Sequence, residues 1–236
     1  EEVVATLQGF MLRCNLPPIT RNDQLPKNPL AVKQSVVLTD LGNKEFEAAA
    51  RGVLEIHTLF ASTLPDNSLV PWKPMKDGEF VCLEFSNRYF SLGRNSSSGL
   101  IELDKDVDPL GILRARCPTG EHTEDNVVLY YEQHLDPESK EKAYVTCKPV
   151  RVRVGQLVEI QVSFCVVPIA KGRYTMLSKL RSVCILGNPI QEASQRLSPL
   201  KKTKRSVGYG TWERSVETES TTSAMKRLRL EDTNMN

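Results

Sequence analysis

Catalytic or metal chemistry in this chain would have to start from three histidines. His122-Thr123-Glu124 has the His-x-Glu spacing of half a facial-triad iron site, the arrangement found in oxygenases. The triad needs a second histidine on a later strand, and the only histidine that follows is the nearby His134. The segment is therefore predicted to be a polar loop that caps a strand. A small-molecule or metal-dependent, oxygenase-like enzyme stays an alternative that would need a deep polar pocket around His122.

Alternating aspartates at 104, 106 and 108 resemble the start of a calcium loop. Pro109 replaces the glycine that such a loop needs, and Ala115 stands where a bidentate glutamate would close the site. The pattern excludes an EF-hand. It favours an acidic turn whose aspartates accept backbone N–H groups, with an opportunistic cation site as the alternative.

Other catalytic and cofactor motifs are missing from the sequence. It has no G-x-S-x-G elbow, no Walker loop and no G-x-G-x-x-G, and its six cysteines form no Cys-x-x-Cys pair. No cofactor is predicted, and a binding role is favoured over an enzymatic one.

A basic strip is the main candidate for binding. Arg151 and Arg153 alternate with valines, so a strand would place both on one face. If neighbouring strands pair, further basic residues join them: Lys148, Lys171, Arg173, Lys179 and Arg181. With exposed aromatics such as Tyr89, Tyr130 and Tyr131, this strip predicts a site for single-stranded DNA or RNA. The alternatives are ordinary solvent-facing charges and a protein–protein interaction module without a nucleic-acid role.

The charge of the chain is unevenly distributed. Residues 188–236 carry nine Lys/Arg against six Asp/Glu, while the whole chain has a net charge of only +2, so the rest is close to neutral. The tail is poor in apolar residues and is predicted to be disordered. No apolar stretch approaches the roughly 18 residues of a membrane span, so no membrane association is expected.

Part of this tail has the form of a nuclear import sequence. Its basic residues are Lys201, Lys202, Lys204 and Arg205, which predict an import receptor as partner and a nuclear, chromatin- or nucleic-acid-associated protein, with the cytoplasm as the alternative. Ser198-Pro199 adjoins them and resembles a proline-directed kinase site. Phosphorylation of Ser198 would add negative charge beside the cluster and weaken receptor binding.

The first part of the chain is predicted to differ from the rest. Four prolines between residues 17 and 29 disfavour helix, so residues 1–40 are expected to form an extended arm. From Asn43 to Leu64 apolar residues recur at helical spacing, with Glu45 and Glu47 in the first turn. This pattern predicts one amphipathic helix over 43–64 at the start of a globular domain of residues 41–187.

Short strands dominate the remainder of that domain. The clearest is 155–167, where apolar and polar residues alternate; the others are 79–85, 99–103, 126–131, 143–147 and a returning strand from Tyr174 after a turn at 171–173. No second long helical pattern offers a crossover for a parallel sheet. The sequence predicts a mainly β (α+β) fold, a small antiparallel barrel or sandwich with one packed helix.

Four segments of the domain carry a resemblance. They are 72–80 (WKPMKDGEF), 106–111 (DVDPLG), 122–126 (HTEDN) and 154–160 (VGQLVEI). Together they resemble a multi-copy group of hypothetical proteins from mushroom-forming fungi, over residues 68–187. That group has no assigned activity, so the resemblance implies a fungal source and no mechanism.

Overall fold

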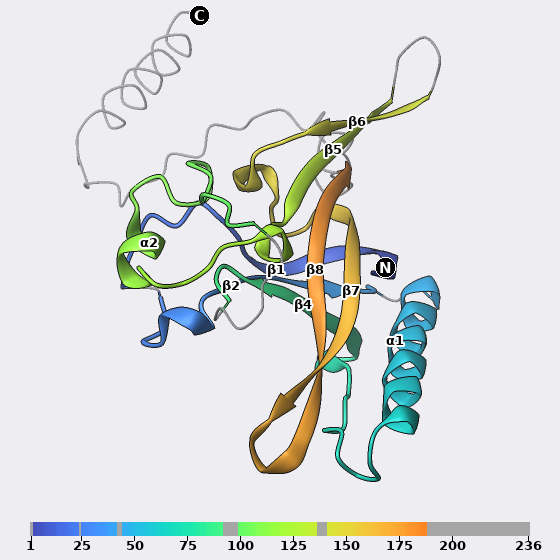
Figure 1. The fold of residues 1–236 in the computed structure, drawn as a ribbon. Coiled ribbons are helices and arrows are strands. Elements are labelled where there is room, and N and C mark those ends of the chain that lie inside the picture. Colours follow the sequence, from blue (N-terminus) through green and yellow to red (C-terminus); the bar gives the residue numbers. More distant parts are fainter. Residues whose placement is uncertain (1, 24, 42–43, 92–98, 136–140, 188–236) are drawn as a thin grey trace, which may run out of the picture. The chain divides into compact units, whose positions relative to one another are not determined.

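Five strands close into a barrel in the computed structural model, which describes residues 2–23, 25–41, 44–91, 99–135 and 141–187 (Figure 1). They are β1 (Val4–Asn15), β2 (Lys33–Thr39), β4 (Phe80–Arg88), β7 (Leu157–Ile169) and β8 (Arg173–Gly187). The order is β4-β2-β1-β7-β8, and a parallel contact between Ser86 of β4 and Lys179 of β8 closes the ring. All other neighbours in the ring are antiparallel. The predicted β-barrel is confirmed.

The barrel is filled by one side of each strand. In β7, Val158, Ile160 and Val162 are buried and point inward, as the alternation in the sequence predicted. Their inward neighbours on the other strands include Leu38 and Leu83. Because successive side chains alternate, the residues between them form the outer surface of the barrel.

The predicted helix is α1 (Lys44–Thr63), which packs on β1 and β4. Phe46, Ala50 and Val53 are its buried residues. Phe46 reaches so close to β1 that a Cβ at Gly9 would lie 2.7 Å from its ring, so only glycine fits there. The helix is thus packed on the barrel through the ring of Phe46, which contacts β1 at a glycine.

The prediction that residues 1–40 form an extended arm is wrong. This segment supplies β1 and β2, and β1 pairs with both β2 and β7 at the centre of the sheet. The prolines lie between the two strands, partly in a short 3₁₀ turn at Pro29–Ala31. They mark the connecting loop and leave the flanking strands uninterrupted.

A long insertion separates β4 from β7. It holds α2 (Ile112–Arg116), β5 (Leu129–Leu135), β6 (Lys142–Thr146) and 3₁₀ turns at Glu124–Asn126 and Pro149–Arg151. β5 pairs with β8 in parallel and with β6 antiparallel. A second, smaller core lies under the insertion: Ile19, Val32, Tyr89, Phe90, Leu113 and Cys117. The predicted strand at 99–103 is wrong, since this segment makes only one isolated bridge, between Leu100 and Thr123.

The strand order β1-β2-β4-β8-β7, closed in a ring with one parallel pair, is that of an OB-like barrel. β3 (Met75–Asp77) forms a hairpin with β4. The predicted disordered tail, residues 188–236, lies outside the described residues. Within the described part of the chain, no helix combines the length and apolarity that crossing a membrane requires.

Candidate nucleic-acid interface

Basic side chains meet on the outer surface where β2, β4 and β8 lie side by side. Lys33 stands opposite Arg88 in the β2–β4 pair, and Lys179 stands opposite Ser86 in the β4–β8 pair. These residues line one hollow of about 260 Å³ together with Ser86, Ser91 and Ser178. Their inward neighbours Gln34, Asn87 and Leu180 are buried, so the basic side chains are on the outer face.

A fourth cation continues this surface onto β1. Arg13 stands opposite Val37, which is itself opposite Glu84, so Arg13 shares the outer face of the β1-β2-β4 sheet. It lines a second hollow of about 480 Å³ with Asn15, Ser35 and Glu84. We refer to Arg13, Lys33, Arg88 and Lys179 as the cationic face.

Most of this positive charge has no ion-pair partner among the described residues, although the acidic Asp125 lines the same hollow as Arg88 and Lys179. Lys33 Nζ lies 2.8 Å from Glu84 Oε1, and both side chains are partly exposed. Among the described residues, Arg13, Arg88 and Lys179 form no ion pair. Three cations on one side of a small barrel therefore lack an ion-pair partner in the described part of the chain and can attract an anionic ligand.

Two asparagines hold this part of the surface in shape. Asn87 Nδ2 donates to the backbone oxygens of Asp125 (2.8 Å) and Leu180 (3.2 Å), which joins β4 to β8 and to the insertion. Asn126 Nδ2 donates to the Arg88 backbone oxygen (3.1 Å) and to Ser91 Oγ (3.1 Å). Both asparagines are buried, so the backbone that carries Arg88 is fixed on both sides.

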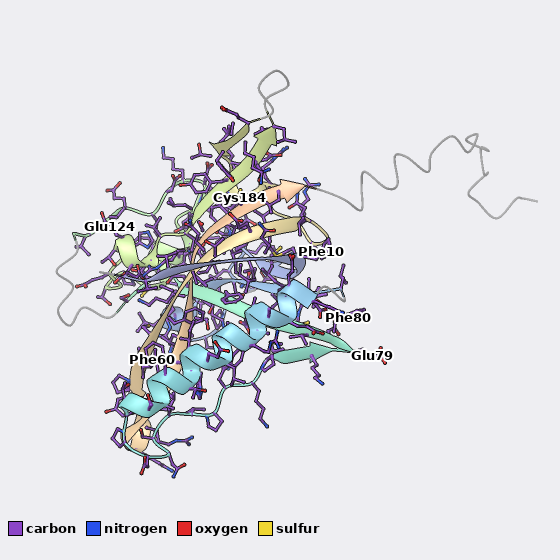
Figure 2. All side chains as sticks on the ribbon, turned by 90° about the vertical axis from the view of Figure 1, so that its right-hand side faces the viewer. Phe10, Phe60, Glu79, Phe80, Glu124 and Cys184 are labelled. Atoms are coloured by element: carbon purple, nitrogen blue, oxygen red, sulfur yellow. The ribbon has the colours of Figure 1, made fainter. Side chains whose placement is uncertain are left out.

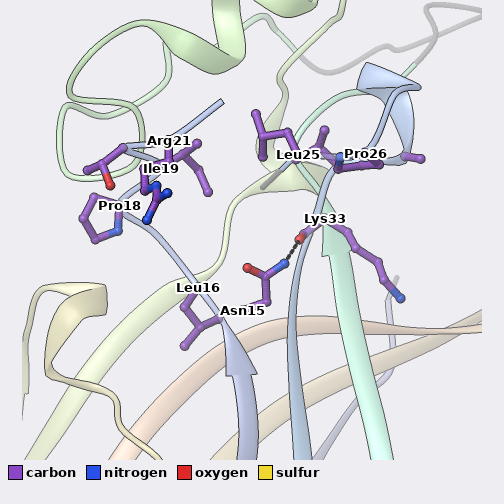
Figure 3. A pocket seen from close by; sticks show the side chains of 11 residues that line it. Asn15, Leu16, Pro18, Ile19, Arg21, Leu25, Pro26 and Lys33 are labelled. Atoms are coloured by element: carbon purple, nitrogen blue, oxygen red, sulfur yellow. Dashed lines mark hydrogen bonds between the residues drawn. The ribbon is translucent and has the colours of Figure 1, made fainter. Parts of the chain in front are cut away.

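The loop between β1 and β2 adds a third hollow, of about 250 Å³, which shares Asn15 and Lys33 with the other two (Figure 3). Asn15 Nδ2 donates to the Lys33 backbone oxygen at 3.4 Å, the contact that is dashed in Figure 3. Arg21 lines this hollow but pairs with Asp23 at 2.9 Å. Among the described residues that line it, this hollow adds no unpaired cation of its own.

At the other end of β4 the outer face becomes apolar. Phe80 is 43% exposed and Met75, on β3, is 39% exposed. Figure 2 shows Phe80 beside Glu79 at the turn that joins β3 to β4. An exposed aromatic ring beyond a line of cations offers a surface on which a base can stack.

The basic strip predicted from the sequence is divided by the structure. Arg151 lies in a 3₁₀ turn and donates to both carboxylate oxygens of Glu132, at 2.9 and 3.0 Å. Arg181 is held by Glu2 and Asp125 and its side chain is only 13% exposed. The other predicted members lie elsewhere: Lys148 pairs with Asp106, Arg153 lies in the loop before β7, and Lys171 and Arg173 lie at the β7–β8 turn. Lys179 is the only predicted residue that joins the cationic face.

The predicted strand around Arg151 and Arg153 is wrong because Pro149 starts a turn in place of a ladder. The expected exposed aromatics also differ, since Tyr89 and Tyr130 are buried. Tyr131 lines a separate hollow with Tyr144, which residues of β7 and β8 complete. Sequence reasoning missed Arg13, Lys33 and Arg88. The signal for Arg88 is the alternation of Glu84, Ser86 and Arg88 with buried residues between them.

His122 and the aspartates lie under the insertion. His122 is buried and its Nδ1 lies 2.8 Å from the Tyr89 backbone oxygen. Burial lowers the pKa of His122 below its ordinary value, and the nearby Arg114 lowers it further, against the effect of the hydrogen bond to Tyr89. No group of three or more metal-binding side chains occurs in the described residues.

The acidic turn predicted at residues 104–108 is confirmed. Asp104 Oδ1 accepts from the Asp106 backbone N–H at 2.8 Å, and Asp108 Oδ2 accepts from that of Arg114 at 3.1 Å. The import residues Lys201, Lys202, Lys204 and Arg205, and the phosphorylation candidate Ser198, lie outside the described residues.

No family model and no curated protein matches the chain. Among solved structures, the chain is similar to the crystal structure of gp2.5, a single-stranded DNA binding protein encoded by bacteriophage T7. The TM-score is 0.41 at 10% sequence identity, over 78% of this chain and 92% of that chain. Similarity at this level gives no information about what this chain binds.

Proposed function

We propose that this protein is a binding module for single-stranded nucleic acid, which lies along the outer face of β1, β2, β4 and β8. Phosphates would contact Arg13, Arg88 and Lys179, and bases would meet the exposed Phe80 at the end of β4. A narrow surface of this kind suits one flexible strand better than a rigid duplex.

One observation carries the proposal: three cations without ion-pair partners among the described residues gather on one outer face from three separate strands. Like charges repel, so placing three cations near one another costs free energy. Surface charges that served only solubility would not need to be close together. In OB-like barrels this strand face is the usual place for oligonucleotides, which is an argument from fold analogy.

The test is fluorescence anisotropy with labelled single-stranded and duplex DNA and single-stranded RNA. We expect the full chain to bind the single strands more tightly than the duplex. Replacing Arg88 and Lys179 by glutamine should weaken single-strand binding about 100-fold, since each hydrogen bond to a charged group contributes about 1.5–3 kcal/mol.

The matched control is the double variant Arg51→Gln/Lys105→Gln, which removes the same charge from two exposed residues outside the cationic face. It should bind as the parent does. Equal losses in both double variants would reduce the interaction to net charge, and no binding by the parent at low salt would refute the proposal.

The tail supports a second part of the proposal, nuclear import. Lys201, Lys202, Lys204 and Arg205 would bind an import receptor, and a phosphate on Ser198 would weaken that contact. A fluorescent fusion should leave the nucleus when these four residues become alanine. A Ser198→Glu variant that stays as nuclear as the parent would exclude the phosphorylation switch.

A protein-interaction role is the second candidate function, and the edge strand β6 favours it. All five residues of β6 are exposed, among them Tyr144 and Val145 at just over half, and the strand ends the sheet. A free edge can accept an added strand from a partner. Loss of a co-purifying protein on Val145→Pro, with DNA binding unchanged, would support this role.

A further inference from the structure

A cavity of about 610 Å³ lies under the insertion, on the far side of Asn126 from the cationic face. Part of its wall is apolar, with Ile101, Val107, Val128 and Leu129. Tyr89, His122 and Tyr130 add polar atoms to this wall. We call it the His122 cavity. Its volume lies in the range of sites that take small ligands.

One buried group in this wall is left without a partner. Tyr89 is 0% exposed, and its hydroxyl has no hydrogen-bond partner among the described residues. The neighbouring Asp108, also buried, has one carboxylate oxygen in the same condition. The Tyr89 hydroxyl is enclosed, so a ligand in the cavity would reach it only after neighbouring side chains move; such a contact would remove the cost of burying the hydroxyl without a partner.

His122 supplies a fixed acceptor. Its Nδ1 faces a backbone oxygen, which can only accept, so Nδ1 must carry the proton. The neutral ring therefore has an unprotonated Nε2, for which no partner occurs among the described residues. The ring is held edge-on against Phe90, with centroids 6.5 Å apart. The cavity wall thus contains an acceptor at His122 and the enclosed hydroxyl of Tyr89.

The rim of the cavity is acidic. Glu102, Asp104 and Asp106 line it, and one lysine, Lys148, lines it and pairs with Asp106 at 2.9 Å. A phosphate at this rim would be repelled. An uncharged group with N–H donors would be attracted, because carboxylates and the His122 Nε2 accept.

We propose that the His122 cavity binds one unpaired nucleobase that carries an amino group, adenine, cytosine or guanine, while the adjacent cationic face holds the phosphates. The identification of the ligand as a base rests on the proposed function. The observations fit this ligand in three respects: a planar heterocycle suits the apolar wall, its N–H groups suit the acceptors, and Asn126 lines both hollows.

The first experiment is titration of the full chain with single nucleosides, followed by calorimetry or NMR. Adenosine and cytidine should bind, and thymidine and purine riboside, which lack the amino group, should bind about tenfold more weakly, the effect of one hydrogen bond to a charged group. Adenosine 5′-monophosphate should bind more weakly than adenosine because of the acidic rim. No binding of any nucleoside at millimolar concentration, or equal binding of adenosine and purine riboside, would overturn the inference.

The matched variants are Tyr89→Phe and Tyr130→Phe. Tyr89→Phe removes the unpaired hydroxyl, so adenosine affinity should fall about tenfold while the melting temperature stays the same or rises. Tyr130→Phe removes a hydroxyl that already donates to Gln34 Oε1 at 2.7 Å, so it should lower the melting temperature and leave affinity within about twofold. The opposite pattern would contradict the assignment of the ligand to Tyr89.

The binding measurements distinguish a failure of the His122 cavity from a failure of the cationic face. Nucleosides that do not bind, with single-strand binding still sensitive to Arg88 and Lys179, would remove the cavity and leave the cationic face. Nucleosides that bind, with strand binding indifferent to Arg88 and Lys179, would remove the cationic face and the claim that the base belongs to a strand.

Discussion

The cationic face and the His122 cavity both adjoin Asn126 and differ in charge and in exposure. The face presents the long side chains of Arg13, Arg88 and Lys179 on an open surface. The cavity presents the buried, fixed groups of Tyr89 and His122 behind an acidic rim. Long exposed cations suit a repeated, uniform anion, whereas fixed buried groups suit one defined ligand. In this arrangement the cationic face would provide most of the affinity for the strand, and the His122 cavity would provide selectivity for the base.

Replacing Asn126, which lines both hollows, should have the largest effect on stability and binding. Asn126 is buried; its Nδ2 donates to Arg88 and Ser91, and its Oδ1 accepts from the backbone N–H and Oγ1 of Thr123. At about 1 kcal/mol each, Asn126→Ala should lower the free energy of unfolding by about 3–4 kcal/mol and weaken both binding activities. Urea denaturation measures it. Asn15→Ala, which loses one long hydrogen bond on the surface, is the control and should change little.

Salt should separate the two surfaces. With three phosphate contacts and a slope of about −0.7 for each, a fourfold rise in salt should weaken single-strand binding about 20-fold. Adenosine is uncharged, so its affinity should stay constant across the same series. Strand binding that ignores salt would contradict the role of the cationic face, and salt-sensitive adenosine binding would contradict that of the cavity.

Lowering the pH should weaken nucleoside binding in the His122 cavity and leave binding at the cationic face unchanged. Burial lowers the pKa of His122 below its ordinary value of 6.5, so at a pH well above 6.5 the ring is neutral in both the folded and the unfolded chain. As the pH falls below 6.5, the unfolded chain takes up the proton first, and the free energy of unfolding declines until the pH passes the folded pKa. Protonation also converts Nε2 from acceptor to donor, so adenosine affinity should fall about tenfold there. His122→Gln should abolish this pH dependence; a profile unchanged in that variant would assign it to other groups.

The smallest effect is expected from freeing Lys33. Glu84→Gln removes the carboxylate that pairs with Lys33, and an exposed pair of this kind contributes about 0.2–1 kcal/mol. Single-strand affinity should rise two- to fivefold, with adenosine binding unchanged. The control is Glu132→Gln, which frees Arg151 outside the cationic face. An equal rise in both variants would show that only net charge matters.

The sequence predicted elements whose pattern is strong within a short window. Helix α1 and strand β7 follow their 3.6- and two-residue periods closely. β1 was missed because an extra residue between Met11 and Arg13 shifts its register and because the following prolines suggested an arm. β2 was missed because nearly all of it is buried, which hides the alternation.

The candidate sites were harder to predict, because strand pairing assembles them. Lys33, Arg88 and Lys179 are far apart in the chain, and only the β2–β4 and β4–β8 registers bring them together. The predicted basic strip relied on neighbours in sequence, and Arg151 and Arg181 turned out to be neutralised by carboxylates from other segments. The sequence identified His122 as a candidate residue. Nothing in the sequence near His122 predicts that Tyr89, 33 residues earlier, accepts its hydrogen bond.

The single parallel contact between Ser86 and Lys179 has a consequence for how the chain folds. The whole insertion lies between these residues, so the ring can close only after β8, the last of the described strands, has been synthesised. Such long-range pairing raises contact order and slows folding. Until then the edges of β4 and β7 are open to other chains, as in any unpaired sheet. A fragment that stops before β8 should therefore aggregate in place of forming half a barrel.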